Sequence, residues 1–323
     1  MRPLKFHPIL KQTLWGGERI IPYKELASGL SRVGESWELS GMPGSESVVA
    51  EGPWAGSTLP ELIGRFGAEL LGKANYARFG QEFPLLVKFI DAREDLSIQV
   101  HPDDELAQKR HGKSGKCEMW YVLEAEPGAS LLTGFSRPID PAEYERRVAD
   151  NTLTDVLNRQ AIASGDVFYL PAGRVHSIGK GSFIVEIQQS SDITYRIYDF
   201  DRRDAAGNPR ELHTELAREA IDFESSENSR ITYAPENNQE VRLITTPYFT
   251  TSLYTLTART RCDWSATDSF VAIVLLQGSG SLTDNEGNRI NVRQGETWLL
   301  PASTQWTEIT PHTAPLRLLT SRI

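Results

Sequence analysis

Short runs of apolar and β-branched residues, separated by Gly, Pro, Asn and Asp, recur along most of this chain. Each run has the length of a β-strand, and no regular alternation of strands with helices is visible. Many short strands with turn residues between them are typical of a sandwich or barrel, so the sequence predicts a mainly β fold. Clear examples are Pro84–Ile90, Trp120–Leu123, Asp166–Leu170, Ser182–Gln188, Leu253–Leu256, Phe270–Leu276 and Glu296–Leu300.

Three segments carry helical signals instead. Leu59–Leu71 has a proline near its start and repeats apolar residues at helical spacing. Pro141–Leu157 follows Asp140, a typical N-cap residue, and Leu212–Phe223 begins close to a threonine. We therefore expect a few helices, packed around the first part of a β protein.

Two segments far apart in the chain repeat one pattern. Gly165–His176 reads GDVFYLPAGRVH and Gly295–Trp306 reads GETWLLPASTQW, with the same spacing from glycine to proline. The simplest account is two copies of one β module. Because Trp306 stands where the first copy has His176, only the first copy is equipped to bind a metal through this position.

The length of 323 residues also suits about two domains. A polar stretch poor in apolar residues, 225–240, is the best linker candidate. The sequence therefore predicts an N-terminal domain with helical segments over residues 1–235. The second β domain, which lacks the histidine, is predicted over residues 236–323.

Charge and apolar content exclude several classes of partner. The net charge is −9, and no block of Lys and Arg occurs, which argues against nucleic acid as a partner. The longest uninterrupted apolar run, Phe270–Leu276, is far shorter than the roughly 20 residues that a membrane helix needs. With no membrane helix and no signal-peptide pattern, we expect a cytoplasmic protein.

Two cysteines, Cys117 and Cys262, are too few for a disulfide framework or for a zinc site of four thiolates. A bound metal would therefore be held mainly by nitrogen and oxygen ligands. By strand alternation we expect Cys117 to face away from the neighbouring residue Glu118 and to be inert.

Four residues could supply such ligands. Gln99 and His101 are two apart, so an extended strand points both side chains to the same face. Glu118 and His176 come from other predicted strands and could converge on the same ion. Two imidazoles, a carboxylate and an amide suit zinc, with manganese or iron as alternatives.

The frame from Gly165 to His176, G-x5-P-x-G-x2-H, matches the second signature motif of the cupin superfamily. Together with SIQVHPDDELA, GKCEMWYVL and VEIQQSSDITYRIYDFDR, it resembles type I mannose-6-phosphate isomerase in its short bacterial form. The resemblance implies two cupin-like (jelly-roll) barrels and a zinc-dependent aldose–ketose isomerase. Such an enzyme interconverts mannose 6-phosphate and fructose 6-phosphate through an enediol(ate).

The resemblance also implies roles for particular residues, with one zinc ion per chain and a small sugar phosphate as the partner. Whether Lys116 or Glu186 is the general base stays open. The zinc ligands would be Gln99, His101, Glu118 and His176, the catalytic residues Arg196, Lys116 and Glu186, and the substrate-binding residues Ser97, Lys88 and Arg202.

Two other functions are compatible with the motifs. One is a non-catalytic metal-binding cupin that binds or senses a sugar phosphate, and the other is a cupin enzyme such as an iron dioxygenase. The basic residues Lys116, Arg196 and Arg202 favour the isomerase, because a dioxygenase has no need of a phosphate receiver. The oligomeric state, monomer or homodimer, the metal used in the cell, the direction of the reaction and the role of the second module stay open.

Overall fold

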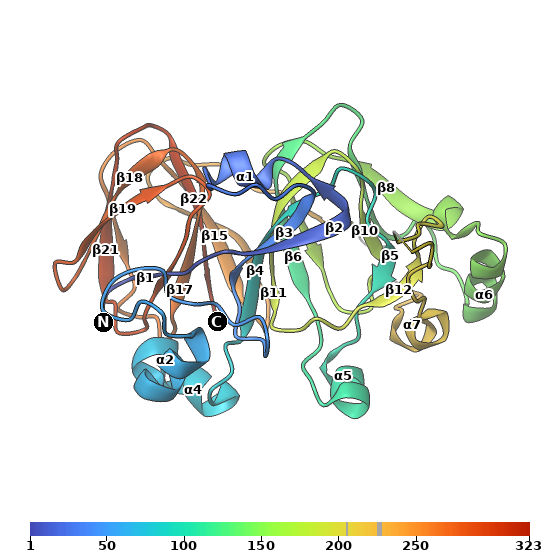
Figure 1. Cartoon of the computed structure of the whole chain (residues 1–323), viewed down its shortest axis with the longest axis horizontal. Helices are drawn as coiled ribbons and strands as arrows, with labels where there is room; N and C mark the ends of the chain where they lie inside the picture. The colour runs from blue at the N-terminus through green and yellow to red at the C-terminus, as the bar shows by residue number, and fades with distance from the viewer. Residues whose placement is uncertain (205, 225–227) are drawn as a thin grey trace.

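The computed structural model describes residues 1–204, 206–224 and 228–323, and within them the strands form four antiparallel sheets in two modules (Figure 1). In the first module the seven-stranded sheet has the order β13 (Arg230–Ile231), β9 (Val167–Leu170), β6 (Glu118–Ala125), β11 (Ser182–Gln189), β4 (Leu85–Asp91), β3 (Val33–Leu39) and β2 (Ile9–Gly17). The five-stranded sheet has the order β12 (Tyr195–Tyr198), β5 (Ile98–Val100), β10 (His176–Ile178), β7 (Ser130–Phe135) and β8 (Leu157–Ala161).

The second module is also built from a larger and a smaller sheet. Its six-stranded sheet has the order β1 (Leu4–Lys5), β20 (Thr297–Leu300), β17 (Val271–Gln277), β22 (Leu316–Arg322), β15 (Thr250–Leu256) and β14 (Glu240–Thr245). Its four-stranded sheet has the order β16 (Thr260–Asp263), β21 (Trp306–Pro311), β18 (Ser279–Asp284) and β19 (Arg289–Arg293). This confirms the predicted mainly β fold with two modules.

The predicted domain boundary at residue 235 falls between β13, in the first module, and β14, in the second. Residues 225–227 of the predicted linker lie outside the described part of the chain. The strand β1 is a further observation, since Leu4 pairs with Leu299 of β20. The first residues of the chain therefore complete the large sheet of the second module.

The large sheets of the two modules share one apolar core. On β4, Val87 and Phe89 lie in the same buried cluster as Ala272 and Val274 of β17. Side chains alternate across a strand, so Lys88 of β4 faces into the first module instead. This double burial explains why Pro84–Ile90 reads as an almost continuous apolar run rather than as an alternating one.

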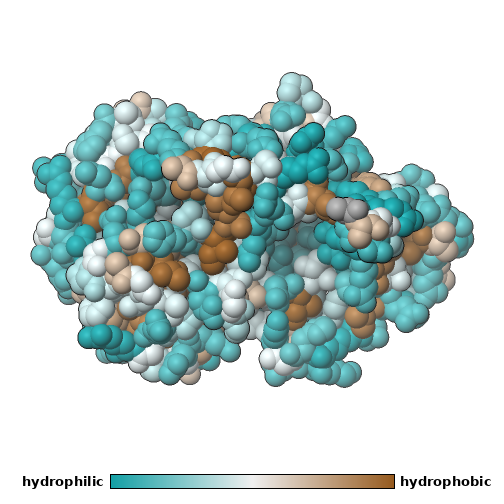
Figure 2. Space-filling view, in the orientation of Figure 1, coloured by the Kyte–Doolittle hydropathy of each residue, from teal (hydrophilic) through white to brown (hydrophobic). Residues whose placement is uncertain are grey.

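The inside of each module has its own apolar cluster. In the first module Trp120, Phe168 and Ile184 lie together between the two sheets. In the second module Ile273, Trp298 and Leu318 do the same. Figure 2 shows a mostly hydrophilic outer face with scattered apolar patches and a hollow over the first module.

Seven α-helices and one 3-10 helix accompany the sheets in the described residues. The predicted helix 59–71 is present but divided, because Gly67 has a φ of +49°. The helix predicted over 141–157 ends at Ala149, and a 3-10 turn follows. The elements are α1 (Ile20–Tyr23), α2 (Leu59–Phe66), α3 (Ala68–Leu71), α4 (Lys73–Phe79), α5 (Asp104–His111), α6 (Pro141–Ala149), η1 (Leu153–Val156) and α7 (Thr214–Ala220).

The helices lie at both modules. Helices α6 and α7 pack on the first module through Tyr144 and Ala217, which share a cluster with Ile197 of β12. Helices α2 and α4 lie beside the second module (Figure 1), where Asp268 accepts hydrogen bonds from the first backbone N–H groups of α4. No helix in the described ranges is long and apolar enough to cross a membrane.

Candidate active site

Three predicted metal ligands meet inside the first module, between its two sheets. Glu118 opens β6, His176 opens β10, and His101 directly follows β5. Glu118 Oε1 lies 3.2 Å from His176 Nε2, and Glu118 Oε2 lies 3.5 Å from His101 Nε2. One potential ligand atom from each residue lies within 4.8 Å of the others, so the three could share one cation.

Both imidazoles present the same ring atom to this centre. His101 Nδ1 lies 2.8 Å from the carbonyl oxygen of Ile193, and His176 Nδ1 lies 2.8 Å from that of Arg174. A carbonyl can only accept, so each Nδ1 carries the proton and each Nε2 keeps a lone pair. Fixing the tautomer through a backbone carbonyl is the usual way to orient a metal-binding histidine.

The protonation states also suit a cation. Burial and the neighbouring Lys116 ammonium lower the pKa of His101 to about 3, and burial lowers the pKa of His176. Burial alone would raise the pKa of Glu118, but the charge of Lys116 outweighs it and holds that pKa well below its usual value. The site is therefore two neutral imidazoles around one carboxylate.

Glu118 lacks the hydrogen bonds that a buried carboxylate normally has. Among the described residues neither of its oxygens accepts one, and its nearest cation is the Lys116 ammonium, with Nζ 2.8 Å from Oε2. Lys116 Nζ also lies 3.2 Å from His101 Nε2. A buried carboxylate needs a cation beside it, and Lys116 supplies one here; a metal ion bound by Glu118 and the two histidines would be a second.

Gln99 joins this group through strand register. In the five-stranded sheet it pairs with His176 on one side and with Arg196 on the other. Its amide nitrogen lies 3.3 Å from His176 Nε2, and its amide oxygen accepts from Ser97 Oγ at 3.3 Å. The sheet thus places Gln99 between the histidine and the predicted catalytic arginine.

A second polar group lies on the seven-stranded sheet. Glu186 of β11 pairs with Lys88 of β4 and with Trp120 of β6. Its carboxylate accepts from Trp120 Nε1 at 2.8 Å and lies 3.1 Å from Lys88 Nζ. Burial alone would lower the pKa of Lys88, but Glu186 and then Glu35 outweigh it and raise that pKa, so Lys88 is an ammonium.

Side chains from both polar groups line one cavity of about 130 Å³. Arg202 does not line it, since its guanidinium binds the Asp95 carbonyl and Asp199 Oδ1. His101, Glu118 and His176 lie next to the cavity, in contact with two of its lining residues. The predicted site residues in the lining are Lys88, Ser97, Gln99, Lys116, Glu186 and Arg196.

Sequence reasoning missed four other polar or aromatic residues of the lining. They are Trp15, Glu35, Thr194 and Arg210. Trp15 and Glu35 lie on β2 and β3, and no spacing rule marked either residue. Arg210 lies in a polar loop before α7, where a charged residue is normally solvated, so the sequence held no signal for it.

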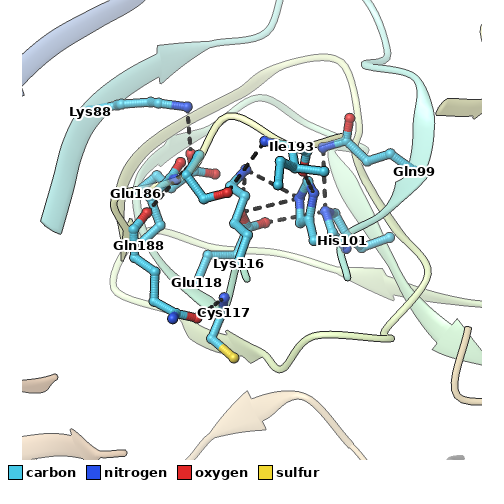
Figure 3. Close-up of polar contacts among 12 residues, drawn as sticks. Lys88, Gln99, His101, Lys116, Cys117, Glu118, Glu186, Gln188 and Ile193 are labelled. Carbon is cyan, nitrogen blue, oxygen red and sulfur yellow. Dashed lines mark hydrogen bonds and ion pairs between the residues drawn. The ribbon is translucent and has the colours of Figure 1, made fainter. Parts of the chain in front are cut away.

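Cys117 lies beside this group without joining it. Figure 3 shows its sulfur pointing away from Glu118 and His101, as strand alternation predicts. Burial raises the pKa of its thiol, so the thiolate is disfavoured.

Known proteins are similar in sequence to this chain over nearly its whole length. A family model described as the catalytic domain of type I phosphomannose isomerase matches residues 4–130. A probable mannose-6-phosphate isomerase of Bacillus subtilis, GmuF, is 34% identical over 303 residues, which cover 93% of each protein. The chain belongs to the type I mannose-6-phosphate isomerase family. It is therefore an enzyme, and an isomerase by its family.

Other members of the mannose-6-phosphate isomerase family extend the likeness. The mannose-6-phosphate isomerase of Streptococcus mutans is 33% identical over 302 residues, covering 93% of this chain and 92% of that protein. The crystal structure of the Bacillus subtilis mannose 6-phosphate isomerase superposes with a TM-score of 0.90 at 30% identity, covering all of both chains. The fold and the likeness thus extend through both modules.

Proposed function

We propose that this chain interconverts mannose 6-phosphate and fructose 6-phosphate in the cytoplasm through an enediol(ate), with one zinc ion bound in the first module. The observation that carries the proposal is the convergence of His101, Glu118 and His176 beside a cavity lined by basic side chains. Membership of the isomerase family supports the same reaction.

The zinc would be held by the two Nε2 atoms, by Glu118 and by the Gln99 amide oxygen, which would exchange places with the amide nitrogen that now faces His176. The donor set fits zinc because the imidazoles are neutral and Glu118 has no other hydrogen-bonding partner among the described residues. When bound, the ion would supply Lewis acidity to an oxygen of the sugar's carbonyl carbon or its neighbour.

The chain's own groups would handle the charge and the proton. Arg196 stays protonated at any accessible pH, so it can stabilise the negative charge of the enediolate or assist ring opening, but it cannot act as the base. Lys116 and Glu186 both line the cavity, and either one could move the proton between the two carbons.

The substrate-binding residues proposed from the sequence are Ser97, Lys88 and Arg202. Ser97 and Lys88 line the cavity and can contact a sugar phosphate there. Arg202 is bound by Asp199 and does not line the cavity. Its proposed role is therefore to add positive charge on this side of the cavity, without contacting the substrate directly.

The test is an assay with mannose 6-phosphate in which fructose 6-phosphate formation is measured. We expect turnover by the purified protein, its loss after the metal is removed by chelation, and its return when zinc is restored. Folded, zinc-loaded protein without turnover would reject the enzyme and leave a binding protein. Full activity after verified metal removal would reject the role of zinc.

A further inference from the structure

The segment Arg210–His213 runs along β12, which is the edge strand of the five-stranded sheet. The backbone N–H of His213 donates to the Arg196 carbonyl at 2.7 Å, and the Arg196 backbone N–H donates to His213 Nδ1 at 3.2 Å. Arg196 Nη1 also donates to the Glu211 carbonyl at 2.9 Å. This short segment therefore fixes both the backbone and the guanidinium of Arg196.

Arg210 enters the cavity lining from the same segment. Its Nε donates to Asp199 Oδ2 at 2.7 Å and its Nη2 donates to Asp199 Oδ1. Asp199 is buried, with 4% of its surface exposed, and it also accepts from Arg202 Nη2 at 2.6 Å. Such a two-bond pair fixes the plane of a guanidinium, and it leaves Arg210 Nη1 outside the pair.

The charges around the cavity are balanced on one side and unbalanced on the other. Lys88 lies 3.1 Å from Glu186, and Lys116 lies 2.8 Å from Glu118. On the side of β12, Arg202 and Arg210 both bind Asp199, and Arg196 lies close enough to feel their charge without bonding to that carboxylate itself. Burial and the proximity of Arg210 lower the pKa of Arg196, which reflects this excess of positive charge.

An excess of positive charge in a partly buried site is compensated best by an anionic ligand. Arg210 lines the cavity whereas Arg202 does not, and the planar guanidinium suits a phosphate group. We propose that Arg210, positioned by Asp199, binds the phosphate of the sugar substrate, and that His213 is a positioning residue for Arg196. This inference rests on the proposed isomerase function, and it assigns two residues that the sequence motifs did not mark.

The test for Arg210 is Arg210→Met in the zinc-loaded enzyme. A charged hydrogen bond to phosphate is lost, so we expect KM for mannose 6-phosphate and Ki for inorganic phosphate each to rise about 10- to 100-fold with little change in kcat. Arg203→Met is the matched control, because Arg203 is exposed and donates to the Gly207 carbonyl away from the cavity. Arg210→Lys keeps the charge, so its KM and Ki should lie between those of Arg210→Met and Arg203→Met.

The test for His213 compares His213→Leu with His213→Asn. Asparagine can replace Nδ1 with its own acceptor oxygen, whereas leucine cannot, so we expect kcat to fall at least 10-fold in the leucine variant and to recover largely in the asparagine variant. Equal loss in both variants would overturn the positioning role.

Failure of this inference differs from failure of the proposed function. If the parent protein has no isomerase activity, the proposed function is wrong, and phosphate binding by parent and Arg210→Met can still be compared by calorimetry. If the parent is active but Arg210→Met and Arg210→Lys, folded as judged by circular dichroism, keep the parental KM and Ki, the role of Arg210 is wrong.

Discussion

The two modules share a strand framework, and the pairing registers show how differently they use it. In the first module Glu118 of β6 pairs with Leu170 of the repeated motif. In the second module Val271 of β17 pairs with Leu300, the matching leucine of the other copy. Val271 therefore stands where the first module has Glu118, its candidate carboxylate ligand.

Two more matching positions also carry different residues in the two modules. His176 at the start of β10 is matched by Trp306 at the start of β21. Trp120 pairs with Glu186, and the matching Ile273 pairs with Thr320. Exchanging a few polar residues for apolar or uncharged ones fills the second module with a packed core, so the strand framework alone does not make a metal site.

The largest expected difference between the modules concerns His176 and Trp306. His176→Ala removes a ligand atom, so we expect loss of bound zinc and a fall in turnover of about a thousandfold or more, since Lewis-acid stabilisation is worth several kcal/mol. Trp306→Ala should keep both the zinc and the turnover. Zinc content after dialysis and kcat measure this, and normal zinc retention by His176→Ala would refute the ligand assignment.

The shared core should make the two modules unfold together. The ring of Phe270, in the second module, lies 4.8 Å from that of Phe83, in the first, and both are buried. We expect Phe270→Ala to cost about 3–5 kcal/mol and to lower the temperature of one common unfolding transition. Calorimetry with activity as a second probe checks this, and the idea fails if activity survives while part of the protein melts early.

The smallest effect concerns the cap that joins α4 to the second module. Asp268 accepts from the N–H groups of Lys73 and Ala74, so Asp268→Ala should cost about 1 kcal/mol at pH 7. The N–H of Ala74 and then that of Lys73 lower the pKa of Asp268. Because the folded pKa lies below the unfolded one, this contribution is present above about pH 4 and is lost as the pH falls through the folded value.

Urea unfolding of parent and Asp268→Ala at pH 7 and pH 3 measures this dependence. The difference in unfolding free energy should shrink at the lower pH. A difference that is the same at both pH values would show that the carboxylate charge contributes nothing to the cap.

Much of the fold could be predicted because strand length and turn residues are local properties. The repeated Gly–Pro frame also revealed the two modules, and the spacing of Gln99 and His101 placed both on one strand or its end. The location of α4 was different, because its first N–H groups bind Asp268, a residue almost 200 positions later in the chain. Local patterns contain no information about such a partner.

At the candidate site too, residues marked by local patterns could be predicted, and residues held by contacts outside those patterns could not. Gln99 and His101 could be placed together because alternation on a strand fixes which face they occupy. Lys116 and Glu186 were marked only by the resemblance to the isomerase family. Arg210 and His213 reach the site from a loop whose path is fixed by contacts with Asp199 and Arg196. That Arg210 lines the cavity and Arg202 does not could be seen only in the coordinates, because both are arginines in similarly polar sequence.

The pairing of β1 with β20 has a consequence for synthesis on the ribosome. Leu4 finds its partner strand only after Leu299 has been made, and the apolar outer face of β4, β6 and β11 is covered by strands that begin at residue 240 or later. At roughly 5–20 residues per second, the first module waits several seconds with that face uncovered. Chaperones that shield apolar surface would have their main opportunity in this interval.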